Sequence, residues 1–466
     1  MSGSFNYKGI WYEPDGLECT VVGCDEDVHY LSIPDVAFDS TIIYQNGEPY
    51  AVSYNFYAPT KIGRSAFSGK RHIIGVSLGN VTWIEDYAFQ NTVITDVTSV
   101  WVTYVGDYAF ADCQLLVTAN FPMATYIGTS AFSNCGLLQA FVLPPDLTHL
   151  GSYAFDNCRD LDYVTCTCPL LKEIPDYCFH NCEDLREFNF PTAQMERIGR
   201  NAFDGCYSLD EISIPDDIKN IGTEAFRGCT QMRKVYLNGA HTTLGENAFA
   251  DCPSITTLRL TANEYTPKMD RVFNGSQGSL QVIELKDNST FIREDCFAGF
   301  KAIHTVDMRE NVTSIGARAF MGCTALKTIP LPNTLVSIGE AAFYNTGLET
   351  VTFPASLQTI GGEAFRYCSH MTSMTSKAEM PPVCSAGRVF DGVDKSIPLY
   401  VPSGSVSYYQ TADQWKDFFT IQAIDETSSV GFVAEDKPSH DKHLHNGQIY
   451  ILRGEKVYTI TGQEVK

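Results

Sequence analysis

The stretch Ile62-Gly63-Arg64-Ser65-Ala66-Phe67 opens a pattern, Ile-Gly-x-x-Ala-Phe, that returns along most of the chain. Its last residue marks each copy, at Phe67, Phe89, Phe110, Phe132, Phe155, Phe179, Phe203, Phe226, Phe249, Phe273, Phe297, Phe320, Phe343 and Phe365, and in a degenerate last copy at Phe390. Neighbouring copies lie between 21 positions (89 to 110) and 25 positions (365 to 390) apart. A fixed period of this length indicates a repeat array rather than one globular core.

Each copy also has a second half, which reads Cys-x-x-Leu-x-x-Ile-x-Ile-Pro in residues 206–215. The alternation of Ile212 and Ile214 around Ser213 predicts a short strand with one buried face. Pro215 ends that strand, because proline cannot donate to a ladder. We expect the Ile-Gly pair to form a tight turn, and the Ala-Phe pair to fill the space between two walls of a coil.

The repeat predicts a β-rich, right-handed leucine-rich-repeat solenoid of about fifteen repeats of about 23 residues. One unit cannot bury its apolar face alone, but stacked units can. The open ends of such a coil expose strand edges and core, so both ends need caps. We expect an N-terminal β cap over residues 1–57, the solenoid over 58–395 and an aromatic-rich C-terminal capping segment over 396–424.

The last residues of the chain leave the period. Residues 425–445 are polar and poor in apolar side chains, which is typical of a linker. Residues 446–466 are predicted to form a β-hairpin that turns at Arg453-Gly454. His440, His443 and His445 lie with Asp441 in the linker, and imidazole and carboxylate suit Zn²⁺. We interpret these four residues as part of a solvated linker and assign no metal.

The sixteen cysteines follow the same period as the phenylalanines. Nine of them stand three residues after a repeat phenylalanine: Cys113, Cys135, Cys158, Cys182, Cys206, Cys229, Cys252, Cys323 and Cys368. Other copies have Thr92, Ser276 or Thr346 there, which indicates a small inward side chain that bonds to a turn, and we expect free, buried thiols. A second group could instead hold a metal or bond between rungs: Cys158, Cys166, Cys168, Cys178 and Cys182. Packing in the core explains the positions of four of these five cysteines without a metal.

Charge and hydropathy argue against several classes of partner. Lys and Arg total 33 and Asp and Glu total 55, which gives a net charge of −22. Nucleic acid and anionic lipid both need a basic footprint, so neither is expected as a partner. No apolar run reaches the roughly 18 residues of a membrane helix. Residues 1–5 lack the basic and apolar regions of a signal peptide, so either the protein is intracellular or the chain has lost an export segment.

The combination Ile-Gly-x-x-Ala-Phe-x-x-Cys-x-x-Leu, followed by an Ile-Pro step, resembles the BspA-type leucine-rich repeats of bacterial surface proteins over about residues 58–395. The resemblance implies a protein that is surface-attached or secreted, and for several members adhesion to host extracellular proteins and co-aggregation. The tail is similar to C-terminal modules of exported Bacteroidetes proteins, some of which act in sorting to the surface. The family has no catalytic motif to transfer, so we expect neither catalytic residues nor a cofactor.

The outward side chains of the repeat strands are the best candidates for binding. The middle of the array offers Tyr163, Glu187, Glu211, Lys234, Tyr236 and Arg259. Tyrosine and arginine are common anchors of protein interfaces, so we expect this region to contact a protein of the host extracellular matrix or of another cell surface. Later units offer the outward residues Thr305, Asp307, Thr350 and Thr352, none of which is of these anchor types.

Two other functions stay open at this point. A carbohydrate-binding protein of a glycan-foraging bacterium would show stacked aromatic side chains on the strand face, which is fairly poor in them. An enzyme would need a pocket with clustered carboxylates whose pKa values are perturbed. The chain has no Gly-x-Ser-x-Gly, Walker, His-Glu-x-x-His or dinucleotide-binding motif.

Overall fold

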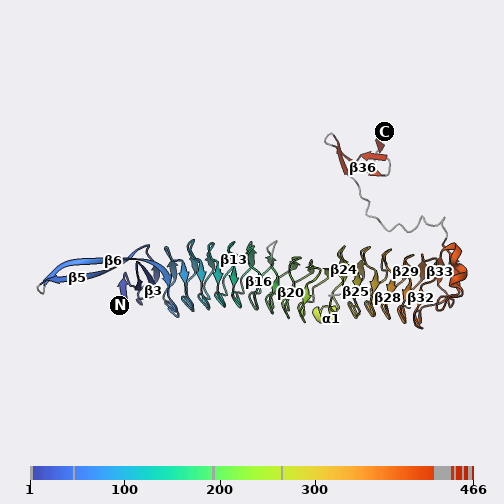
Figure 1. Ribbon diagram of the computed structural model, residues 1–466, viewed down its shortest axis with the longest axis horizontal. Helices are drawn as coiled ribbons and strands as arrows, with labels where there is room; N and C mark the ends of the chain where they lie inside the picture. Colours follow the sequence, from blue (N-terminus) through green and yellow to red (C-terminus); the bar gives the residue numbers. More distant parts are fainter. Residues whose placement is uncertain are drawn as a thin grey trace.

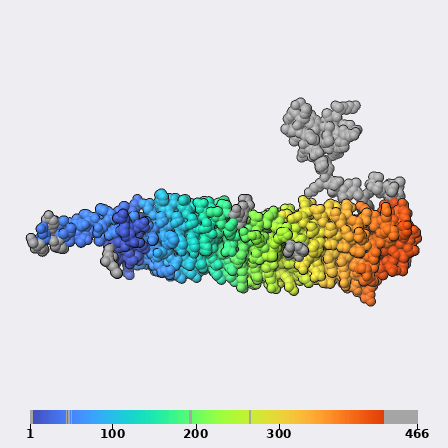
Figure 2. All heavy atoms as spheres, in the orientation of Figure 1, coloured from blue at the N-terminus to red at the C-terminus, as the bar shows by residue number. Residues whose placement is uncertain are grey.

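The computed structural model describes residues 4–45, 48–190, 195–263 and 266–424, together with the backbone of four strands in the tail. The coil has about 16 turns of roughly 23 residues, stacked along one axis into an elongated body (Figures 1 and 2). The leucine-rich-repeat solenoid predicted from the repeat is therefore confirmed.

Most turns contribute one strand to a face that we call the long-strand face. Side chains alternate along each strand, so that Val164 and Cys166 are buried while Tyr163 and Thr165 are exposed. Neighbouring strands pair in parallel within three sheets. The first has β9 (Asp96–Thr98), β11 (Thr118–Asn120), β13 (Ala140–Leu143), β15 (Tyr163–Cys166) and β17 (Glu187–Asn189); the second has β19 (Glu211–Ile214), β21 (Lys234–Leu237), β23 (Thr257–Leu260), β24 (Val282–Leu285) and β26 (Thr305–Asp307); the third has β29 (Thr350–Phe353), β31 (Ser373–Ser376), β33 (Pro398–Val401) and β34 (Thr420–Ala423).

A second parallel ladder, which we call the short-strand face, consists of strands of two residues that end at the repeat isoleucine or its equivalent. Its strands are β8 (Trp83–Ile84), β10 (Tyr104–Val105), β12 (Tyr126–Ile127) and β14 (His149–Leu150); β16 (Glu173–Ile174), β18 (Arg197–Ile198), β20 (Asn220–Ile221) and β22 (Thr243–Leu244); and β25 (Phe291–Ile292), β27 (Ser314–Ile315), β28 (Ser337–Ile338), β30 (Thr359–Ile360) and β32 (Val383–Cys384). The expected tight turn at Ile-Gly is therefore wrong, because the isoleucine lies in a strand.

The glycine of the motif is needed for close stacking rather than for a corner. The N–H of Gly151 donates to the carbonyl of Ile127 in the preceding turn, with an N–O distance of 2.8 Å. A Cβ atom at Gly151 would lie 2.3 Å from the carbonyl carbon of Gly128, so no larger residue fits there without a shift. The corners lie on either side of the repeat phenylalanine, as at Tyr153 (φ 60°) and Asn157 (φ 57°) around Phe155.

The repeat phenylalanines form a stacked column through the core, in two parts that run from Phe67 to Phe273 and from Phe297 to Phe390. The ring centroid of Phe155 lies 5.4 Å from that of Phe132 and 5.3 Å from that of Phe179, and the three rings are nearly parallel. Beside the column runs the cysteine ladder, in which each of the nine thiols donates to the carbonyl of the repeat phenylalanine one turn back, as Cys158 does to Phe132 at 3.2 Å. The prediction of free, buried, turn-bonded thiols at these nine positions is confirmed.

The N-terminal residues form strands that extend the short-strand face. They are β1 (Phe5–Tyr7), β2 (Ile10–Asp15), β3 (Glu18–Cys24) and β6 (Glu48–Ile62), with β5 (Ala37–Gln45) paired to β6, while β4 (Tyr30–Ser32) pairs with β7 (Gly75–Ser77). Strand β6 has 15 residues and is the longest strand that the structure describes. It runs from a hairpin with β5, which projects beyond the end of the coil (Figure 1), into the first turn, where it pairs with β8.

Aromatic side chains cover the C-terminal end of the core. The 3-10 helix η1 (Ser403–Ser405) and helix α2 (Val406–Tyr409) follow β33. The buried ring of Trp415 lies 5.0 Å from that of Phe390, the last repeat phenylalanine, and its Nε1 donates to the carbonyl of Pro382 at 2.9 Å. The other helix, α1 (Met269–Val272), directly precedes Phe273, in the turn between β22 and β25 that has no short strand.

The tail forms an antiparallel meander of β35 (Lys442–His445), β36 (Gln448–Arg453), β37 (Lys456–Thr459) and β38 (Glu464–Val465). Strands β36 and β37 pair as the two arms of the expected hairpin. Strand β35 lies inside the segment that we expected to be linker. His440, Asp441 and the side chains of His443 and His445 lie outside the described residues.

Candidate functional site

The six residues predicted to bind a partner all lie on the long-strand face. Tyr163, Glu187, Glu211 and Lys234 are the first residues of β15, β17, β19 and β21, while Tyr236 and Arg259 lie two residues further along β21 and β23. All are exposed except Tyr236, which is half-buried. The parallel register places Tyr163 beside Glu187, Glu211 beside Lys234, and Tyr236 beside Arg259. The structure thus gathers them on one surface, although in two groups.

A break in the ladder separates the two groups. Backbone bonds connect Arg186 N to Asp162 O (3.0 Å) on one side and Arg233 N to Asp210 O (2.7 Å) on the other. The equivalent bond from Asp210 N to Arg186 O is not made, and β17 and β19 belong to different sheets. Each strand therefore presents an unpaired edge to the other at this point.

Two large side chains lie at the break. Phe188 and Phe190 occupy successive inward positions, where β15 has valine and cysteine and β19 has two isoleucines. Their rings lie 4.8 Å apart, and the ring of Phe188 lies 5.0 Å from Phe203 in the phenylalanine column. Phe188 is buried, and Phe190 stays half-buried. Phe190 consequently presents an aromatic surface beside the break.

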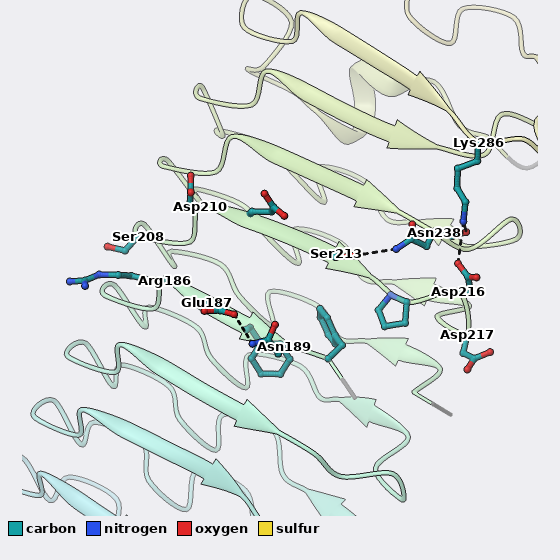
Figure 3. Close-up of a pocket in the computed structure, with 14 residues that line it drawn as sticks. Arg186, Glu187, Asn189, Ser208, Asp210, Ser213, Asp216, Asp217, Asn238 and Lys286 are labelled. Atoms are coloured by element: carbon teal, nitrogen blue, oxygen red, sulfur yellow. Dashed lines mark hydrogen bonds and ion pairs between the residues drawn. The ribbon is translucent and has the colours of Figure 1, made fainter. Parts of the chain in front are cut away.

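A hollow of about 1030 Å³ lies over this break, and its lining combines an apolar floor with a charged rim. Phe190 and Pro215 contribute apolar surface. Figure 3 shows Arg186, Ser208 and Asp210 at one end of the hollow and Asp216, Asp217 and Lys286 at the other, with Glu187 and Asn189 between them.

The charged groups of the rim are mostly paired. Arg233 donates to both carboxylate oxygens of Asp210 at 2.5 Å, and these bonds hold the pKa of Asp210 below its ordinary value. Lys286 reaches across three turns to Asp216 (3.3 Å) and also donates to the carbonyl of Asn238 (2.7 Å). Paired charges keep the rim ordered and cost less to cover than isolated ones.

A second exposed cluster lies next to the hollow. The guanidinium of Arg259 lies over the ring of Tyr236, 4.6 Å from its centroid, and pairs with Glu284 at 2.7 Å. The cation–π contact and the ion pair together fix the position of the arginine. Lys234 lies 3.6 Å from Glu211 across the same face. The cluster and the hollow form one continuous candidate surface from β15 to β24.

Reasoning from the sequence missed Phe190 and the break itself. The residue pair Phe188-x-Phe190 was visible, and so was Pro175, which stands where most copies have the motif glycine. Proline has no N–H to donate to Leu150 in the preceding turn, so the short ladder also ends, between β14 and β16. Departures from the repeat at these positions are the signal that could have located the irregular region.

The short-strand face carries a column of aromatic rings that the sequence reading also missed. Trp83, Tyr104, Tyr126 and His149 stack with centroid distances of 3.8, 4.5 and 4.3 Å and interplanar angles of 10 to 12°. Burial of the Tyr104 hydroxyl, chiefly, raises its pKa to about 12. Because each ring covers its neighbour, the column offers ring edges to solvent, whereas sugar stacking needs free ring faces.

The cysteine group that could have held a metal is part of the core. Cys166 and Cys168 are buried, and Cys158 and Cys182 belong to the thiol ladder. Burial raises the pKa of the Cys178 thiol well above its ordinary value, which keeps it protonated. Among the described residues, no three His, Cys, Asp or Glu side chains come together as a metal site requires. The helices of the described ranges are also too short to span a membrane.

Comparison with known families identifies the chain. The sequence model of the BspA type leucine rich repeat region (6 copies) matches residues 54–162, 161–276 and 269–372, which together are more than half of the chain. The chain therefore belongs to the BspA type leucine-rich-repeat family. Proteins of this family are typically non-enzymatic binding scaffolds, and many are found at the cell surface. A search of curated proteins finds no match.

Solved leucine-rich-repeat structures resemble the chain at low identity. A leucine-rich repeat protein from Bacteroides ovatus ATCC 8483 is 23% identical, with 90% of this chain and 100% of that chain covered and a TM-score of 0.48. A leucine rich cell surface protein from Faecalibacterium prausnitzii A2-165 is 20% identical, with 84% and 99% covered and a TM-score of 0.38. The pneumococcal vaccine antigen PcpA is 14% identical, with 91% and 99% covered and a TM-score of 0.31. These likenesses do not bear on function.

Proposed function

We propose that this chain is a non-enzymatic binding protein, at the cell surface or secreted, whose long-strand face between β15 and β24 adheres to another protein. The observation that carries the proposal is the break between β17 and β19, where a hollow lined in part by Phe190 opens between two of the three sheets of the long-strand face. A protein of the host extracellular matrix or of another cell surface is the proposed partner.

The chemistry of this surface suits a protein loop or side chain. Phe190 and Pro215 offer apolar contact, and the ordered Tyr236–Arg259 pair offers the residue types that most often anchor protein interfaces. The paired rim charges favour a partner with complementary charges and add specificity more than affinity. The acidic chain as a whole favours a partner with a basic or neutral surface.

The test is binding of the full chain to an array of extracellular-matrix proteins and glycans at low and high salt. We expect a protein ligand whose binding survives high salt, because the apolar floor is not screened. The substitutions Phe190→Ser and Tyr236→Ala are each expected to weaken that binding by roughly 30-fold, the effect of losing about 2 kcal/mol at an anchor residue. Charge reversal of Lys234 and Arg259 should also weaken it.

The matched control is Thr350→Ala with Thr352→Ala on β29, which are exposed positions of the same face outside the candidate surface. This control should bind like the unmodified chain. The proposal fails if the Phe190, Tyr236 and charge-reversal variants all bind normally. A ligand found only among the glycans would also overturn it.

A further inference from the structure

The hairpin of β5 and β6 stands apart from the coil over most of its length. Its strands pair from Ala37 with Tyr57 to Gln45 with Glu48. At its base, the ring of Tyr7 lies 4.6 Å from that of Phe38, and β6 pairs with β3 only from Ala58 onward. The outer part of the hairpin forms a narrow projection at the N-terminal end of the body (Figures 1 and 2).

One face of this projection is apolar. Cross-strand pairs at alternate positions join Phe38 to Phe56 and Ile42 to Val52, and Tyr54 lies between them, so these side chains share a face. The rings of Phe38 and Tyr54 lie 5.7 Å apart. Phe56 is 60% exposed and Tyr54 is 53% exposed, which is unusual for aromatic side chains that already cluster.

The outer edge of β5 has no protection against pairing. Natural edge strands are guarded by lysine, proline, a covering element or inward charges. Strand β5 has nine residues, with Asp39 near its base as the single charged residue, and in the described part of the chain it pairs with β6 alone. A long, apolar and unguarded edge of this kind is a template for a further strand.

Charge indicates which partner can use that edge. The chain carries a net charge of −22, yet residues 40–60 contain one charged side chain, Glu48. Two copies of so acidic a chain repel one another over most of their surfaces. The hairpin is the uncharged place where two copies can meet, and because it projects along the axis of the coil, the two acidic bodies can extend in opposite directions.

We infer that two copies of this chain associate through their β5 edges, antiparallel about a two-fold axis near Thr41, into a four-stranded sheet with one continuous apolar face. A two-fold arrangement lets each copy offer the same edge and the same apolar face to the other. The apolar face of each hairpin has three aromatic side chains, Phe38, Tyr54 and Phe56, and an aromatic side chain buries at most about 150–250 Å². Stable interfaces use about 800 Å² per partner, so this interface is small. The dimer is therefore expected to dissociate on dilution into the micromolar range. The inference is independent of the long-strand face.

Sedimentation velocity of the full chain over a range of concentrations tests the inference. We expect a concentration-dependent dimer for the unmodified chain and a monomer for the double variant Ile42→Glu, Tyr54→Glu. The control is Phe419→Glu, which removes an aromatic side chain that is 81% exposed near the other end of the coil and should leave the dimer intact. A melting temperature within a few degrees of the unmodified chain shows that each variant is folded.

Cross-linking tests the geometry of the dimer. The natural cysteines are buried apart from the half-buried Cys384, so a cysteine introduced at an exposed position dominates the reaction. Thr41→Cys should form a disulfide-linked dimer under mild oxidation, and Thr352→Cys should not. A chain that stays monomeric at about 100 μM overturns the inference, since even weak specific interfaces form at that concentration. Equal cross-linking at both positions also overturns it. The inference is also overturned if the double glutamate variant still forms dimers. It is overturned as well if vesicles or a different protein bind the hairpin and no dimer forms.

Discussion

The turns from β10 to β14 and those from β15 to β19 follow one repeat and differ in what their surfaces can do. In the first region, Gly128 and Gly151 donate to the turn before at 2.8 Å, and the short ladder continues without interruption. In the second, Pro175 cannot donate, and Phe190 is left half-buried where the long ladder opens. The comparison teaches that regular repeats build the rod, while departures from the repeat create a surface with its own chemistry.

The largest expected effect comes from the phenylalanine column. Phe155→Ala removes a fully buried ring that stacks on both neighbours and should lower the free energy of unfolding by about 3–5 kcal/mol. Phe190→Ala, in the open region, should cost about 1–2 kcal/mol because its ring is half-exposed. Denaturant unfolding of both variants measures the difference, and equal losses would contradict the contrast between the two regions.

The next effect concerns the motif glycine. Gly151→Ala forces a methyl group against the backbone of Gly128 and should destabilise the chain by about 2–3 kcal/mol. Gly136→Ala is the matched control, since nothing lies within 4 Å of its Cβ position. That substitution should be neutral or stabilising by up to about 1 kcal/mol. Thermal unfolding separates the two, and a tolerated Gly151→Ala would show that the turns are not closely stacked.

The third prediction concerns the pH dependence of stability, which tests whether the break in the long ladder extends into the core. Burial raises the pKa of the Cys113 thiol to about 11 from 9.0, and it also raises the pKa of Cys206 beside the break. Because the folded state holds these protons more tightly, the stabilisation is complete below pH 9 and is lost as the pH rises toward the folded pKa. The loss for Cys113 is about 3 kcal/mol, at 1.36 kcal/mol for each of two pKa units.

The matched variants are Cys113→Ser and Cys206→Ser, since serine is a natural occupant of this position at Ser276. Each should reduce the fall in the free energy of unfolding between pH 9 and pH 11. Similar reductions would show that the thiol ladder passes intact beneath the break. A variant at Cys206 without any effect would mean that the core is open there as well.

The parts of the fold that depend on local periodicity were predictable from the sequence. The alternation around Ser213 returns in most turns, and nine copies have a cysteine three residues after the repeat phenylalanine, so the strands and the thiol ladder follow directly. The short strands were not predictable from such a pattern, because two residues such as His149 and Leu150 are too few to show an alternation. The role of Gly151 depends on a backbone one turn away.

The candidate site was predictable only in part. Outward positions such as Glu187 and Arg259 follow from the strand pattern, so their common face could be inferred. The hollow could not, because it depends on how Phe188 and Phe190 pack beside Phe203, which is a contact between turns. The length of the hairpin of β5 and β6 could not be predicted either, since it is set by pairing across a turn rather than by a repeat.

Hydrogen–deuterium exchange, read by mass spectrometry on overlapping peptides, tests the ladder break most directly. We expect the amide of Asp210, which lacks its partner in Arg186, to exchange much faster than the equivalent amides of Arg186 and Arg233, which donate at 3.0 and 2.7 Å. A bound protein ligand should slow exchange at Asp210. Equal and slow exchange at all three amides in the free chain would mean that the ladder is continuous, and would contradict the proposal that the binding surface is built on its interruption.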